Sequence, residues 1–250
     1  MSKSICLNAD LGELHGEDGR ALDAAMLRVV TRCNIACGGH AGDAYSMRRT
    51  AEVAKTHRVR IGAHPSYPDI EHFGRRSLQL APEALALSLQ VQVNSLLEIA
   101  KTAGVQVTHL KAHGALYNDA AKDGALARLI AGVAAGAGIP ELVGPPGSSL
   151  GAAAQVTGLR FLAEGFVDRS YEPDGALTPR SIPGAVIEDA AAMLAQAVLV
   201  VRSGVVDVRG GGRIALPVQT LCLHSDTPGG AGLAAVLRAG LAAAGVEVRA

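Results

Sequence analysis

Three segments between residues 59 and 113 decide the fold: VRIGAH (59–64), PEALALSLQVQVNSLLEIAKTA (82–103) and THLKAH (108–113). The first and third are short apolar runs that end in a polar residue, which is typical of buried strands. The middle segment has Pro82 at a helix-start position, leucines at helical spacing, and Gly104 as a stop. Because parallel neighbouring strands need a long crossover, this stretch predicts one β–α–β unit with parallel strands.

The same alternation extends over the whole chain. Further strands are predicted at residues 5–10, 32–37, 141–144, 160–164 and 219–224, and further helices at 120–136 and 186–203, after Asp43 and after Thr227. Seven parallel strands in 250 residues fit a closed β/α barrel, and an open doubly wound sheet is the alternative. Ionisable residues follow almost every strand. In an open sheet they would gather at the one point where the strand order reverses, so this distribution favours the barrel. We therefore expect an α/β fold, a single-domain parallel β/α barrel over residues 1–250 with seven strands.

Three stretches interrupt the alternation. Residues 66–81 and 168–183 are too long for ordinary connections, and loops of that length usually carry function. Residues 205–216, which contain three consecutive glycines, predict a small β-hairpin.

Composition and charge exclude several classes of protein. The 250 residues are 49% hydrophobic, and 23 Lys and Arg balance 23 Asp and Glu. The chain is thus predicted to fold, and nothing in its charge favours nucleic acid or a membrane surface as a partner. No apolar run approaches the ~18 residues of a membrane span. The chain starts without a signal peptide and its cysteines form no CxxC pair, so we expect a cytoplasmic protein with reduced thiols.

Polar side chains with catalytic chemistry lie at the predicted strand ends. In NADLGE (residues 8–13), strand alternation places Asn8 and Asp10 on one face, and Glu13 follows on the loop. Asn8 lies within an apolar strand, where an unpaired amide is costly, so a functional role is favoured over a capping one. Four histidines follow four other strands: His40, His64, His113 and His224. One such histidine is usually structural, but four expected at one rim predict a site.

Other charged residues extend this set. Lys111 and Glu164 lie at strand ends, and Arg169 and Arg180 lie in the loop over residues 168–183. Arginines are suited to carboxylate or phosphate groups, although a surface ion-pair loop is an equal alternative. The segment GPPGSS (144–149) is not a phosphate loop, because it lacks the lysine and contains prolines. The residues by themselves predict a hydrolytic or metal-assisted enzyme.

As a set, these motifs resemble the LamB/YcsF family. The matching segments are LNADLGE (7–13), NIACGGHAGD (34–43), IGAHPS (61–66), FGR (73–75), the region 107–118 around KAHG, EGFVDRSY (164–171), PRS (179–181) and TLCLHSD (220–226). They occur in order over almost the whole chain. One difference is Gly39, which stands where an aromatic residue is common in the family, so we expect a wider site there.

The resemblance implies a barrel similar to that of polysaccharide deacetylases. It also implies the activity of the A subunit of the ATP-dependent 5-oxoprolinase, which cleaves 5-oxo-L-proline to L-glutamate with ATP hydrolysis, together with subunits B and C. Deacetylase-like barrels bind a divalent metal ion through one Asp and two His. Asp10, His40 and His64 are the corresponding candidates in this chain.

The implied reaction assigns roles to the strand-end residues. Asp10 and Glu13 are candidate bases, and His64, His113 or His224 is the candidate acid. Lys111, Arg169 and Arg180 are the candidates for binding phosphoryl oxygens and ATP, and Glu164 completes the predicted catalytic set. Two other functions stay open: a stand-alone metal-dependent amidase or deacetylase that needs no ATP, and a non-catalytic scaffold for the partner subunits.

Overall fold

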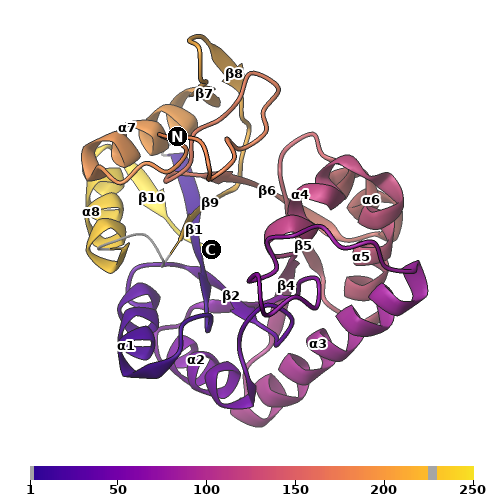
Figure 1. The fold of residues 1–250 in the computed structure, drawn as a ribbon. Coiled ribbons are helices and arrows are strands. Elements are labelled where there is room, and N and C mark those ends of the chain that lie inside the picture. Colours follow the sequence, from indigo (N-terminus) through magenta and orange to yellow (C-terminus); the bar gives the residue numbers. More distant parts are fainter. Residues whose placement is uncertain (1–2, 225–229) are drawn as a thin grey trace.

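The chain forms a closed barrel of seven parallel strands, as predicted, in a computed structural model that describes residues 3–224 and 230–250 (Figure 1). The strands are β1 (Lys3–Leu11), β2 (Arg32–Ala36), β3 (Arg60–His64), β4 (Val107–Lys111), β5 (Glu141–Gly144), β6 (Arg160–Phe166) and β9 (Thr220–His224). Each pairs with the next in this order, and β9 closes the barrel against β1. A short strand, β10 (Val246–Val248), pairs with the start of β1. The closure excludes the open doubly wound sheet.

Helices surround the barrel and connect its strands (Figure 1). They are α1 (Gly16–Leu27), α2 (Ala44–Thr56), α3 (Pro82–Ala103), α4 (Gly114–Lys122), α5 (Gly124–Gly136), α6 (Ser149–Thr157), α7 (Ala190–Ser203) and α8 (Gly230–Ala243). The bounds of α3 are those predicted, and Asp43 begins α2 with a reciprocal capping box to Ser46. The predicted start of the last helix, at Thr227, lies outside the described residues.

The helix predicted over residues 120–136 is wrong, because two helices share that region. Between α4 and α5 lies Asp123, whose side chain accepts hydrogen bonds from the backbone N–H groups of Ala125 and Leu126. An aspartate in this position is an N-cap, so it begins a second helix instead of continuing the first. The sequence analysis also did not identify α1, α6 or β10.

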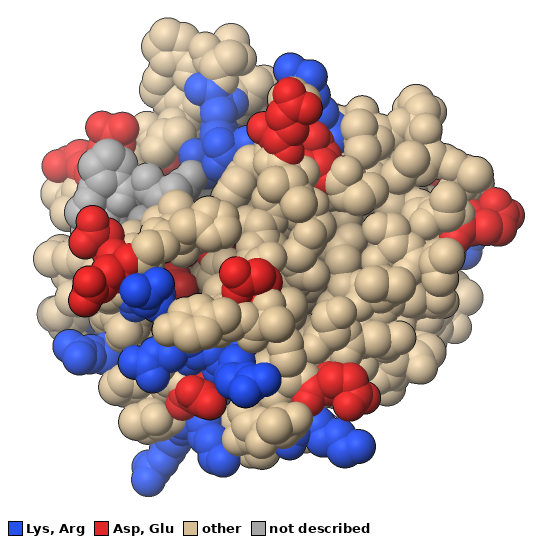
Figure 2. All heavy atoms as spheres, turned by 60° about the horizontal axis from the view of Figure 1, so that its bottom comes forward, with Lys and Arg blue, Asp and Glu red and all other residues tan. Residues whose placement is uncertain are grey.

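The predicted hairpin is present. Strands β7 (Val205–Asp207) and β8 (Arg213–Ala215) pair antiparallel and project from the edge of the barrel beside α7 (Figure 1). On the face drawn in Figure 2, Lys and Arg side chains are interspersed with Asp and Glu around a broad uncharged area. Within the described residues, no helix is long and apolar enough to span a bilayer.

The apolar core lies between the strands and the helices, whereas the inside of the barrel is polar. Leu7, Ile35 and Leu110 are fully buried and face the helices, while His109 and Arg32 on alternating positions are buried inside the barrel. Gly62 makes room for one of these side chains, because a Cβ there would overlap the ring of His109. The lack of a side chain at Gly62 on β3 therefore leaves room for His109 of β4 inside the closed barrel.

The end of β1 is fixed by a carboxylate from α1. Asp23 Oδ2 accepts a hydrogen bond of 2.9 Å from the backbone N–H of Gly12, whose φ of 75° turns the chain out of the strand. Asp23 Oδ1 has no hydrogen-bond partner among the described residues. Burial raises the pKa of Asp23 to about 7.

We predict that Asp23→Asn changes how stability depends on pH. A carboxyl group whose pKa is higher in the folded than in the unfolded state binds a proton on folding, so folding stability falls as pH rises from about 4 to about 7. Above this window the wild type should have lost up to ~4 kcal/mol that Asp23→Asn does not lose. Thermal melts of both proteins across the same pH window measure the difference. Parallel curves would contradict the prediction.

Candidate active site

A cavity of about 760 Å³ lies at the carboxyl ends of the barrel strands. Eight of the predicted site residues line it: Asp10, Glu13, His64, Lys111, His113, Glu164, Arg169 and Arg180. His40 is fully buried beside the cavity, against Glu13. His224 is the last residue of β9 and is in register with Asp10, but its side chain lies outside the described part of the structure. The strand ends therefore bring the described members of the predicted set together.

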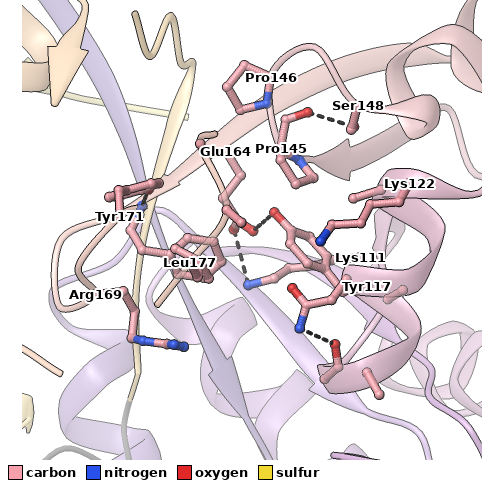
Figure 3. Close-up of a pocket in the computed structure, with 18 of the residues that line it drawn as sticks. Lys111, Tyr117, Lys122, Pro145, Pro146, Ser148, Glu164, Arg169, Tyr171 and Leu177 are labelled. Carbon is pink, nitrogen blue, oxygen red and sulfur yellow. Dashed lines mark hydrogen bonds and ion pairs between the residues drawn. The ribbon is translucent and has the colours of Figure 1, made fainter. Parts of the chain in front are cut away.

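Lys111 lies at the centre of the site (Figure 3). Its Nζ is 3.0 Å from Asp10 Oδ1 and 3.1 Å from Glu164 Oε1, so the buried ammonium group contacts two buried carboxylates. Burial by itself would lower the pKa of Lys111, but the neighbouring negative charges, Asp10 first, raise it well above its usual value. Lys111 is thus a buried cation in the wall of the cavity.

Glu164 is held from both sides. Its Oε1 accepts a hydrogen bond of 3.0 Å from Asn8, and its Oε2 accepts one of 2.9 Å from the hydroxyl of Tyr117 on α4 (Figure 3). Burial and the Glu164 charge raise the pKa of Tyr117 well above its usual value, so the phenol keeps its proton. The functional interpretation of Asn8 agrees with this contact: its amide binds a site carboxylate.

Asp10 is oriented from inside the barrel. Asn34 Nδ2 donates to Asp10 Oδ1 at 2.7 Å and to Asn8 Oδ1 at 2.8 Å. Asn34 Oδ1 in turn lies 2.9 Å from Nε2 of His109, one layer deeper in the barrel. Asp10 therefore accepts hydrogen bonds from both Lys111 and Asn34.

Beside this network, four side chains gather around one point. Glu13, His40, His64 and His113 each offer one ligand atom, and these four atoms lie within 4.8 Å of one another. Two members, His40 and His64, belong to the predicted metal set; the third, Asp10, lies 3.4 Å from Nε2 of His64, with its oxygens bonded to Lys111 and Asn34.

Charge within this cluster is set by burial and by hydrogen bonds. Burial lowers the pKa of His40 to about 4 and lowers that of His113, so both rings are neutral at pH 7. Although burial by itself raises the pKa of Glu13, its contacts with His113 and His40 bring it far below its usual value. The cluster thus presents a carboxylate beside the neutral imidazoles of His40 and His113.

Arg169 has a structural contact as well as a place in the cavity wall. Its Nε donates to the carbonyl of Ala185 at 3.3 Å and its Nη2 to that of Thr178 at 2.5 Å, which holds the loop after β6 in place. Burial and the nearby charges of Arg180 and Arg75 lower its pKa. Three arginines therefore gather at the cavity, where negatively charged groups are favoured.

The expected widening at Gly39 does not occur. A Cβ at this position would overlap Gln92 Oε1 and would lie 2.5 Å from Ser66 Oγ. Gln92 fills the space and forms a double hydrogen bond with the backbone of Ser66, two residues after His64. The expectation was wrong because a side chain from α3 occupies the room that the glycine leaves.

The sequence analysis missed three polar residues that shape the site. Tyr117 could have been found as a polar residue on an otherwise apolar helix face next to the KAHG segment. Asn34 is a polar residue inside a buried strand, β2, as Asn8 is in β1, and this pattern could have identified it. His109 lies at the middle of a strand rather than at its end, so it carried no signal.

The chain belongs to the LamB/YcsF family, whose model matches residues 5–250. It is 47% identical to the 5-oxoprolinase A subunit of Methylococcus capsulatus over 100% of this chain and 96% of that protein. The 5-oxoprolinase A subunit of Chloroflexus aggregans is 46% identical over 98% of both chains. The crystal structure of a lactam utilization protein from Thermus thermophilus superimposes with a TM-score of 0.89 at 37% identity, covering 99% of each chain.

We predict that Lys111→Met strongly destabilises the protein. The change leaves two buried carboxylates without their shared cation, and breaking such a pair costs about 3–5 kcal/mol. Denaturant unfolding at pH 7 measures the loss, and part of it should be recovered in mildly acidic buffer, where one carboxyl group can bind a proton. Lys122→Met, which alters a lysine at the cavity rim, is the matched control. Equal stability of the two variants would contradict the prediction.

Proposed function

We propose that this chain is the lactam-opening subunit of an ATP-dependent 5-oxoprolinase, which hydrolyses 5-oxo-L-proline to L-glutamate with conversion of ATP to ADP and phosphate. The observation that carries the proposal is Lys111, held between Asp10 and Glu164 at the cavity. Support comes from relatives that are named as the A subunits of 5-oxoprolinases and that match the whole chain. A scaffold would not need a buried ammonium group between two carboxylates beside a cavity.

The reaction requires a base, charge stabilisation and an acid. A lactam is a stable amide, and phosphorylation of its oxygen makes the ring carbon electrophilic. Asp10 is the base that takes a proton from the attacking water, because its carboxylate is kept ionised by Lys111 and Asn34. Lys111 stabilises the negative charge on the phosphoryl oxygens next to the ring carbon. Breakage of the ring C–N bond leaves an acyl phosphate, and its hydrolysis releases phosphate and L-glutamate. The proton for the leaving nitrogen is the one that Asp10 takes from the attacking water, so the same carboxyl group acts first as base and then as acid.

The arginines suit the anionic parts of the substrate. Arg169 and Arg180 lie in the cavity wall that the loop after β6 forms, and the guanidinium group matches planar carboxylate and phosphoryl oxygens. With Lys111 deeper in the site, a phosphorylated lactam would place its reacting carbon near Asp10 and its phosphoryl group toward the loop.

The complete reaction needs partners. The sequence contains no phosphate-loop motif, and the names of the relatives designate one subunit of several. We therefore assign ATP turnover to the assembly of this chain with subunits B and C. Its four cysteines are buried free thiols, which supports a cytoplasmic location.

The substitution Asp10→Asn tests the proposed base. Removing a general base typically costs ~10²–10⁴-fold in rate. Glu164 still neutralises Lys111 in this variant, so we expect it to fold with a lowered melting temperature. Glutamate release by the assembled enzyme, with kcat and KM measured separately, should show the loss in kcat.

Asp69→Asn is the matched control, since Asp69 is a similarly buried carboxylate, paired with His72 away from the cavity. It should keep wild-type kcat. Near wild-type turnover by folded Asp10→Asn would show that Asp10 is structural and not the base.

The requirement for partners is tested by reconstitution. We expect the purified chain to release little glutamate from 5-oxo-L-proline and ATP, and addition of subunits B and C to give glutamate and phosphate in equal amounts. Robust ATP-driven turnover by the chain alone would overturn the assignment to the assembly. Hydrolysis of other amides without ATP would instead identify the stand-alone amidase.

A further inference from the structure

The hydrogen bonds of His64 fix which of its nitrogens carries a proton. His64 Nδ1 lies 2.8 Å from the backbone carbonyl oxygen of Lys111. A carbonyl oxygen only accepts hydrogen bonds, so Nδ1 is the protonated nitrogen. In the neutral ring, Nε2 of His64 is consequently a bare acceptor.

His113 is fixed in the opposite tautomer by the same kind of contact. Its Nε2 lies 3.0 Å from the carbonyl oxygen of Phe73, so Nε2 carries the proton and Nδ1 is bare. This bare Nδ1 lies 3.0 Å from the bare Nε2 of His64. Two lone pairs thus face each other within hydrogen-bond distance, with no hydrogen between them.

A carboxylate oxygen and a third imidazole complete the group. Glu13 Oε1 lies 3.2 Å from His113 Nδ1 and 3.7 Å from His64 Nε2. His40 Nε2 lies 2.9 Å from the same oxygen, and its ring stacks on that of His113 at 3.6 Å. His40 Nδ1 has no hydrogen-bond partner among the described residues, so no carbonyl group fixes the tautomer of this ring.

Electron pairs that converge in this way require a positive charge between them. One proton would satisfy one pair of atoms and leave the others facing a lone pair, and a charged imidazole would be buried against a second ring. A metal ion satisfies all four. In a tetrahedral site with bonds of ~2.1 Å, neighbouring ligand atoms lie roughly 3.4 Å apart. Four of the six separations, 2.9–3.7 Å, fall around this value, and all six are within 4.8 Å.

We propose that Glu13, His40, His64 and His113 hold one divalent transition-metal ion of the zinc class. Three imidazoles and one carboxylate suit Zn²⁺ and related ions, whereas Mg²⁺ prefers oxygen ligands. The carbonyl oxygens of Lys111 and Phe73 orient two of the ligands, as such outer contacts do in known metal sites. Asp10 stays with Lys111 in this arrangement.

The proposed ion has a defined place relative to the cavity. Glu13, His64 and His113 line the cavity, whereas His40 lies behind them. An ion bound there would supply Lewis acidity at the cavity floor. The backbone carbonyl of Lys111 accepts the hydrogen bond from His64, and its ammonium group pairs with Asp10. The same residue therefore orients a proposed metal ligand and holds the proposed base.

Binding of Zn²⁺ alone tests the proposal. The untagged full chain is stripped with a chelator and titrated with Zn²⁺ and with Mg²⁺ by calorimetry. We expect one Zn²⁺ per chain and no comparable Mg²⁺ binding. His113→Gln should lose at least ~100-fold in Zn²⁺ affinity, since removing even a residue that only orients a ligand lowers metal affinity 10–100-fold. Bound Co²⁺ should give the intense visible absorption of a tetrahedral site.

His57→Gln removes an exposed histidine at the end of α2 and should keep wild-type affinity. Circular dichroism and a melt of each metal-free variant establish folding, and Glu13→Gln replaces His113→Gln if the latter does not fold. The proposal is overturned if the wild type binds Zn²⁺ no more tightly than folded His113→Gln or Glu13→Gln. Because glutamate formation is not measured, this result is independent of the proposed reaction.

Discussion

The buried ammonium group of Lys111 is the constraint on which the rest of the site depends. A lysine this deeply buried is tolerated only with opposite charge nearby, and here two carboxylates from two other strands of the barrel supply it. Because Asp10 lies near the end of β1 and Glu164 lies in β6, the lysine on β4 links three strands that are not neighbours. Closure of the barrel and assembly of the site are therefore one event: if the strands do not close, neither carboxylate reaches the ammonium group.

The polar interior of the barrel gives this arrangement a direction. Arg32 can only donate hydrogen bonds, and its Nη1 contacts Nδ1 of His109 at 3.5 Å. His109 then donates from Nε2 to Asn34 Oδ1, which turns the amide so that Nδ2 points to Asp10. A chain of polar contacts thus links Arg32 at one end of the barrel to the Asp10 carboxylate at the other. Burial and the charge of Arg32 lower the pKa of His109 well below its usual value, which keeps the ring neutral for this role.

Much of the fold could be predicted because local signals agreed with the tertiary structure. The alternation of apolar runs with Pro82–Ala103 and similar helices specified the parallel barrel, and strand-end residues such as His64 were placed correctly at one cavity. The break between α4 and α5 was not predicted, because an N-cap inside an alanine-rich run is a local feature within a continuous helical pattern. His109 and Tyr117 were missed because their roles depend on contacts across the barrel, which one strand or helix does not encode.

The packing at Gly39 means that the residue allowed at position 39 depends on the residue at position 92, which is far away in the sequence. Since Gln92 on α3 occupies the volume that a side chain at position 39 would need, an aromatic residue there is compatible only with a smaller or retracted residue at position 92. The two positions are expected to vary together among relatives, and a loop over residues 34–43 transplanted from a relative with the aromatic residue would not fit this barrel unchanged. The same glutamine holds Ser66 beside His64, so such an exchange alters the support of a site residue as well as the packing.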